Sequence, residues 1–187
     1  INGPYNVGII DFFIPMKYQG GHFSEGNQNG ASCDAVMNET RYLPVRLFYP
    51  TDDKITGRIP YLNPETVNDF CHRSMERAPS PLKGIGWIMH TLRLNTLSVQ
   101  PHATVAAGPE DSLPLVVLSH GVGASYDVYA YQSISLACHG TMVLVPTHLD
   151  GTAPVAQQPT GRRPILFDVR PKQLEEEGKK KEASQLR

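Results

Sequence analysis

The stretch PLVVLSHGVGAS, residues 114–125, decides how the fold of this sequence is predicted. Its first half is a continuous run of β-favouring apolar side chains, which is typical of a strand covered on both faces. The run ends in Ser-His-Gly-Val-Gly, where the two glycines allow a sharp turn. A serine beside a histidine raises a question. Either Ser119 is a nucleophile, or the turn has another use.

The residues after this turn predict a helix and a second buried strand. Apolar side chains recur at helical spacing from Val128 to Cys138, and Gly140 stops the pattern, as glycine does at many helix ends. TMVLVP, residues 141–146, follows as the next buried strand. A strand, a helix and a strand within about 35 residues form a βαβ unit, which requires parallel strands. We therefore predict an α/β fold with a mostly parallel central sheet flanked by helices.

On either side of this centre, the spacing of apolar residues and the positions of Pro and Gly predict further helices, strands and loops. Val45, Leu47 and Tyr49 alternate with Arg46 and Phe48, as in a strand. The expected elements are a strand over 5–15 ended by Pro15, a loop over 17–36, a strand over 42–50, helices over 63–78 and 84–94, a loop over 150–164 and an exposed helix over 170–187.

The composition argues against several classes of protein. The 187 residues fit one domain, and 17 basic against 18 acidic residues give a net charge of −1, without the basic excess of a nucleic-acid binder. No apolar stretch approaches the about 20 residues that cross a bilayer. The three cysteines have no metal-ligand spacing, so we expect no metal and no cofactor, and Cys138 fits a core position. The chain opens at Ile1 without a signal-like segment, which suggests a processed or truncated product.

Ser119 is a poor candidate for a nucleophile. An exposed nucleophilic serine after a strand normally needs Gly-x-Ser-x-Gly, because the glycines permit the strained turn that presents it. Val117 replaces the first glycine here, and the motif occurs nowhere in the chain. We therefore expect the Ser119 hydroxyl to bond locally at the end of the strand.

The backbone of the HGVG turn has a more plausible use. A turn of this type can present N–H groups to a substrate carbonyl, and each donor can stabilise a developing oxyanion by about 3–4 kcal/mol. The Val122 N–H is the natural donor, and Gly121 and Gly123 let the chain approach a substrate closely. We expect His120 to support the turn through a hydrogen bond rather than to act as a base.

Four segments, in the right order and spacing, carry a resemblance to a known family. They are NGPYNVGIID at 2–11, VRLFYP at 45–50, PLVVLSHGVGA at 114–124 and LACHGTMVLVPTHLD at 136–150. Together they resemble the N-terminal half of the platelet-activating-factor acetylhydrolases, a family of secreted and intracellular lipid esterases. The resemblance covers nearly the whole chain and is weakest at 16–40 and 51–105.

This resemblance implies that residues 1–187 are the N-terminal part of a single α/β-hydrolase domain. It implies a serine esterase of the 1-alkyl-2-acetylglycerophosphocholine type, which hydrolyses short or oxidised sn-2 acyl chains of phospholipids, with Val122 donating in the oxyanion hole. The serine elbow, acid and histidine would follow residue 187, so we expect this chain alone to be inactive. His148 and Asp150 are not assigned to a triad, because the family has no triad member there and the usual order is serine, acid, histidine.

The resemblance also implies contact with lipid. Residues 64–95 correspond loosely to the family's membrane-facing helices, which would place four side chains on a membrane or lipoprotein surface, with burial in the core as the alternative. These side chains are Trp87, Ile88, Met89 and Leu92. Asn38, in the tripeptide NET, is a glycosylation acceptor if the protein is secreted, although such tripeptides are common by chance. A secreted and a cytoplasmic location both stay open.

Two other functions remain as alternatives: a general carboxylesterase, and a non-catalytic hydrolase-like fragment with a structural or interaction role. In the hydrolase interpretation the strands at 114–119 and 141–146 lie inside a sheet whose other strands follow residue 187. Without those strands an apolar edge would be open to aggregation. We therefore expect the C-terminal half of the protein as a partner, either as a separate chain or as a continuation.

Overall fold

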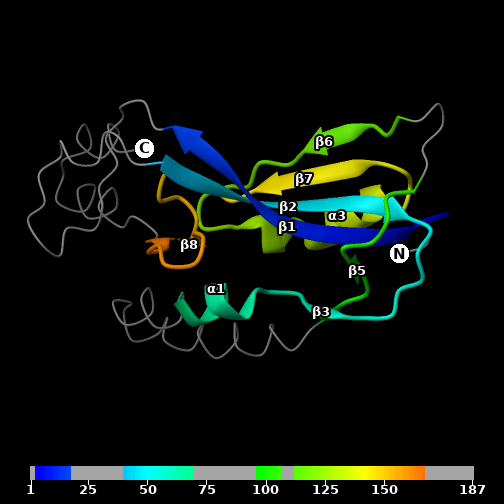
Figure 1. The fold of residues 1–187 in the computed structure, drawn as a ribbon, viewed down its shortest axis with the longest axis horizontal. Coiled ribbons are helices and arrows are strands. Elements are labelled where there is room, and N and C mark those ends of the chain that lie inside the picture. Colours follow the sequence, from blue (N-terminus) through cyan, green and yellow to red (C-terminus); the bar gives the residue numbers. More distant parts are fainter. Residues whose placement is uncertain (1–2, 18–39, 70–95, 107–111, 167–187) are drawn as a thin grey trace, which may run out of the picture.

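The computed structural model describes residues 3–17, 40–69, 96–106 and 112–166 (Figure 1). A five-stranded sheet occupies the centre of this part of the chain, with the strand order β5-β1-β2-β7-β6. The strands are β1 (Asn6–Lys17), β2 (Thr40–Thr51), β5 (Gln100–Pro101), β6 (Leu115–Val117) and β7 (Met142–Pro146).

The β6–β7 side of the sheet has the predicted βαβ connection. β6 leads through the 3₁₀ helix η5 (Tyr126–Tyr129) and the helix α3 (Ala130–Ala137) into β7, which is parallel to β6. Gly140 has a φ of 95° and its N–H donates to the Ala137 carbonyl, so a glycine ends the helix as predicted. The α/β fold class is confirmed. β2 pairs antiparallel with both β1 and β7, whereas β1 and β5 are parallel, so the sheet is mixed.

The ladder between β1 and β2 is longer than the sequence predicts. β1 continues to Lys17 instead of ending at Pro15, and Pro15 pairs with Tyr42. The predicted end at Pro15 is therefore wrong. Proline lacks an N–H, but β5 pairs with β1 only at Gly8 and Ile9. At Pro15 the other edge of β1 has no neighbouring strand among the described residues, and an edge position tolerates proline.

Helix α3 packs on one face of the sheet and lies behind the strands in Figure 1. Its buried Ile134 belongs to a cluster with Phe48 of β2 and Val143 of β7. Each large apolar side chain buried in this way contributes roughly 1.5–3 kcal/mol before entropy. Cys138 belongs to the same cluster and is 3% exposed, which confirms its predicted core position.

β6 is an edge strand, and its second face is open. Leu115 and Val117 are 56% and 59% exposed, and their register partners on β7 are Met142 and Leu144. These residues point away from the cluster that contains Val143. The prediction of a strand covered on both faces is therefore wrong for the described part of the chain. The physical reason is that the described residues place no layer over this face of β6, and no strand lies beyond its edge.

An ion cluster, buried at Arg46 and Asp127 and half exposed at Asp11, joins β1, β2 and η5. Arg46 donates two hydrogen bonds of 2.7 Å to the carboxylate of Asp11, its register partner on β1, and one of 2.6 Å to Asp127 of η5. The guanidinium also lies 4.2 Å from the ring centroid of Tyr126. Arg46 and Phe48 are both buried, so the predicted alternation along β2 does not separate a core face from a solvent face.

Burial and ion pairing have opposite effects on the pKa values of Arg46 and Asp127. Burial would lower the pKa of Arg46, but the hydrogen bonds that Arg46 donates to Asp11 and the charge of Asp127 outweigh that effect and raise it. Burial raises the pKa of Asp127 to about 6, and the Arg46 charge only partly offsets the rise. At pH 7.5 the Asp127 carboxylate beside Arg46 is therefore charged.

Shorter elements surround the sheet. α1 (Pro64–Asp69) begins at the predicted proline. Two small antiparallel pairs were not predicted: β3 (Ile59–Pro60) with β4 (Thr96–Leu97), and β8 (Val155–Ala156) with β9 (Ile165–Leu166), the latter beginning in the segment predicted as a loop.

Several predicted elements lie outside the described residues. They are the remainder of the 63–78 helix, the 84–94 helix, the 170–187 helix and nearly all of the 17–36 loop. Within the described ranges, no helix has the length and apolar character needed to span a membrane.

Candidate active site

Two polar loops meet where β6 and β7 end. Because the two strands are parallel neighbours, their carboxyl ends lie at the same edge of the sheet, where ligands bind in open α/β sheets. The Ser119 hydroxyl oxygen lies 2.9 Å from His148 Nε2. The rings of His120 and His148 are stacked with their centroids 3.8 Å apart.

His120 is buried under the turn, and its hydrogen bonds fix its protonation. The His148 backbone N–H donates to His120 Nε2 at 2.9 Å, so that nitrogen carries no proton. Nδ1 therefore carries the hydrogen and donates to the Gly121 carbonyl at 2.9 Å. Burial lowers the pKa of His120, which favours the neutral ring that these two bonds require. The expected hydrogen bond between His120 and the turn is present.

The HGVG turn, residues 120–123, presents Val122 to solvent. Gly123 has a φ of 79°, in the left-handed region that favours glycine, and its N–H donates to the Thr152 carbonyl at 2.7 Å. The Val122 side chain is 73% exposed, and its N–H has no acceptor within the described ranges. A Cβ added at Gly121 or Gly123 would meet no heavy atom within 4 Å, so the space beside the turn is open.

Thr152 extends the contact between Ser119 and His148 to a carboxylate. Its hydroxyl donates to Asp150 Oδ1 at 2.5 Å and lies 3.3 Å from His148 Nδ1. The chain order argued against a triad containing His148 and Asp150. In the structure His148 contacts Ser119 directly, and Thr152 links His148 to Asp150. The sequence analysis missed Thr152. The available signal was the Asp-Gly-Thr tripeptide, because an aspartate often accepts a hydrogen bond from the N–H two residues later, as Asp150 does here.

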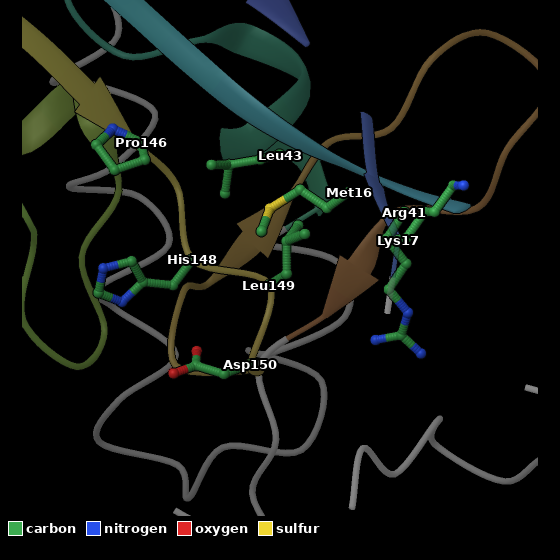
Figure 2. A pocket seen from close by; sticks show the side chains of 8 residues that line it. All are labelled: Met16, Lys17, Arg41, Leu43, Pro146, His148, Leu149 and Asp150. Carbon is green, nitrogen blue, oxygen red and sulfur yellow. The ribbon is translucent and has the colours of Figure 1, made fainter. Parts of the chain in front are cut away.

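A cavity of about 410 Å³ lies beside His148 (Figure 2). Figure 2 shows His148 and Asp150 at one end of this cavity and Lys17 and Arg41 at the other. Between these ends its walls are apolar. They are formed by Met16, Leu43, Pro146 and Leu149.

The remaining predicted site residues lie outside the described part of the chain, so nothing in the structure bears on them. They are Trp87, Ile88, Met89 and Leu92, which were expected on lipid, and the glycosylation acceptor Asn38. Within the described ranges no three His, Cys, Asp or Glu side chains are grouped so that they could hold a metal ion.

Comparison with known protein families identifies the family of this chain. The family model described as platelet-activating factor acetylhydrolase, isoform II, matches residues 1–179. The chain belongs to this acetylhydrolase family. The match includes both polar loops of the candidate site, residues 118–125 and 147–152, and confirms the family predicted from the four sequence segments.

Among solved structures, this acetylhydrolase-family chain is similar to a ferulic acid esterase from Streptomyces cinnamoneus. The two are 22% identical, and the TM-score is 0.49. The alignment covers 87% of this chain and 38% of the esterase chain, so the present chain spans less than half the length of that protein.

Proposed function

We propose that this chain is the part of a serine-dependent lipid esterase that contributes to the oxyanion hole. The observation that carries the proposal is the Val122 N–H. It sits in a glycine-bounded turn beyond the carboxyl end of β6 and has no acceptor within the described ranges. Membership of the acetylhydrolase family supports ester hydrolysis. The proposed substrate is a phospholipid with a short or oxidised sn-2 acyl chain.

The proposed reaction is acyl transfer through a serine. The serine oxygen attacks the carbonyl carbon of the sn-2 ester while a base takes its proton, and the carbonyl oxygen becomes an oxyanion. Val122 donates its N–H to that oxyanion, which stabilises the transition state more than the bound ester. The C–O bond to the glycerol then breaks, and the lysophospholipid leaves with the proton. Water releases the acyl group from the serine by the same steps.

In this proposal the nucleophilic serine and the residues that transfer protons lie outside residues 1–187. The resemblance places the serine elbow, its acid and its histidine after residue 187, and no Gly-x-Ser-x-Gly occurs in the chain. The role proposed here for Gly121 and Gly123 is to leave space for the substrate. The open space beside both glycines supports this role.

The cavity beside His148 supports an amphiphilic substrate. Its apolar walls, which include Leu43 and Leu149, suit an acyl or alkyl chain. Lys17, at the end away from His148, suits the phosphate of a lipid headgroup. The lining of the cavity also contains His148, whose backbone N–H donates to His120 of the HGVG turn.

A comparison of two substrates tests the proposed function. The natural protein, with whatever sequence flanks residues 1–187, is assayed with an acetyl-phospholipid and with a simple aryl ester. We expect kcat/KM to favour the phospholipid, with one serine labelled by a fluorophosphonate probe. Hydrolysis of the aryl ester alone would contradict the lipid substrate and favour a general carboxylesterase.

A second candidate is a non-catalytic interaction or structural role, favoured by the open face of β6. Leu115 and Val117 expose more than half of their surface there, and exposed apolar faces of this kind mark contact surfaces. The covering partner that we propose is the C-terminal half of the protein, as a continuation or a separate chain. If the fluorophosphonate probe labels no serine in the natural protein, the non-catalytic role is favoured over the esterase.

A further inference from the structure

The loop over residues 148–152, called here the positioning loop, holds the HGVG turn and the residue before it at three points. In line with its proposed role, the HGVG turn (residues 120–123) is called here the oxyanion turn. The His148 N–H donates to His120, and the Thr152 carbonyl accepts from the Gly123 N–H. The third contact joins the side chains of His148 and Ser119, 2.9 Å apart. These contacts lie on both sides of Val122, whose N–H has no acceptor within the described ranges.

Thr152 fixes the direction of the hydrogen bonds along the positioning loop. Its hydroxyl has one hydrogen, which it donates to Asp150, so its oxygen can only accept from His148 Nδ1–H. In a neutral ring, His148 Nε2 then has the lone pair and accepts from the Ser119 hydroxyl. The chain Ser119–His148–Thr152–Asp150 therefore runs in one direction and ends on a carboxylate, which strengthens its hydrogen bonds.

We propose that Thr152 and His148 are positioning residues, which hold the oxyanion turn in place through Ser119, His120 and Gly123. The proposal rests on the esterase function above and concerns the same site. Catalysis depends on such support because an oxyanion donor must lie within hydrogen-bond distance of the developing charge. A displacement of about 1 Å can cost about 100-fold in rate. The positioning loop follows β7 and supplies this support through its hydrogen bonds to the turn that follows β6.

Ser119 is an attachment point in this arrangement, not the nucleophile. The Leu118 N–H donates to the Leu144 carbonyl at 2.9 Å, so pairing with β7 continues to the residue before Ser119. A nucleophilic serine instead sits on a sharp, strained turn. Among the described residues, His102 alone has a positive φ without being glycine, so Ser119 shows no such strain.

The test uses Thr152→Val in the natural protein, because valine keeps the shape and the backbone carbonyl but removes the hydroxyl. We expect kcat for an acetyl-phospholipid to fall by about 10-fold to 100-fold with KM unchanged, as for an interaction that matters in the transition state. Thr152→Ser, which keeps the hydroxyl, restores kcat to within about threefold of the natural value. Thr160→Val, at an exposed threonine of the neighbouring segment, serves as the matched control and leaves kcat unchanged.

Two further measurements separate the possible outcomes. Amide hydrogen exchange at Gly123 should be faster in Thr152→Val than in Thr152→Ser, and this readout does not depend on activity. Unchanged exchange and unchanged kcat in Thr152→Val would overturn the positioning role, and so would fluorophosphonate labelling of Ser119. If the natural protein hydrolyses no ester while exchange responds as expected, the proposed function fails and the support of the turn by Thr152 stands.

Discussion

Replacing Asp127 by asparagine should measurably destabilise the protein, because both oxygens of this buried carboxylate accept hydrogen bonds. Oδ1 accepts from Arg46 at 2.6 Å, and Oδ2 accepts from the Asn63 N–H at 3.2 Å. Asparagine has one oxygen, so its NH₂ group must face one of these two donors. The loss of a hydrogen bond to a charged group costs about 1.5–3 kcal/mol, and a buried donor without an acceptor adds about 1–3 kcal/mol.

Part of this cost is offset, because the variant no longer buries a carboxylate whose pKa burial raises to about 6. We therefore expect Asp127→Asn to lower the free energy of unfolding by about 2–3 kcal/mol. Urea denaturation of the natural protein and the variant at pH 7.5, where Asp127 is charged, measures this difference.

Asp11→Asn is the matched control, because Asp11 binds the same arginine with a side chain that is 48% exposed. Solvent can satisfy the new NH₂ group there, so we expect a loss of less than about 1 kcal/mol. If Asp11→Asn destabilised the protein as much as Asp127→Asn, the burial argument would be refuted. The attraction to Arg46 alone would then account for both losses.

Three further predictions concern the HGVG turn and the open face of β6. Burial lowers the pKa of His120 below its ordinary value of 6.5. The neutral ring of His120 therefore stabilises the protein above about pH 6.5, and this stabilisation is lost as pH falls through the lowered pKa. Urea titrations of His120→Gln should lack this pH dependence. Gly123→Ala should cost about 1 kcal/mol or more in thermal unfolding because of the positive φ, whereas Gly121→Ala should cost less. In residues 1–187 produced alone, lysine at Leu115 and Val117 should reduce binding of an apolar dye, and undiminished binding would contradict an open β6 face.

The centre of the fold could be predicted from the sequence because its signals are local. The apolar run at 114–119 and the stop at Gly140 each depend on neighbouring residues, and both predicted the βαβ unit. The continuation of β1 past Pro15 could not be predicted in this way. It depends on which edge of β1 has a neighbour, and that is set by the distant segment β5.

The candidate site was only partly predictable for the same reason. The HGVG turn is continuous in sequence, and glycine spacing was enough to single out Val122. The contact between Ser119 and His148 spans 29 residues and exists because β6 and β7 are adjacent and parallel. Chain order argued against His148 and Asp150 as triad members, but it said nothing about their use in holding a turn. The Asp-Gly-Thr tripeptide indicates a contact between Asp150 and Thr152, but the position of the Thr152 hydroxyl between Asp150 and His148 depends on the folded loop.

The most direct test of the central claim is kcat for an acetyl-phospholipid in Val122→Pro and Val122→Ala variants of the natural protein. Proline removes the N–H that is proposed to bind the oxyanion, whereas alanine keeps it and removes only exposed side-chain atoms. With thermal unfolding unchanged, we expect Val122→Pro to lose about 100-fold to 1000-fold in kcat and Val122→Ala to stay within about threefold. Equal losses in both variants, or full activity of Val122→Pro, would contradict the proposed oxyanion donor.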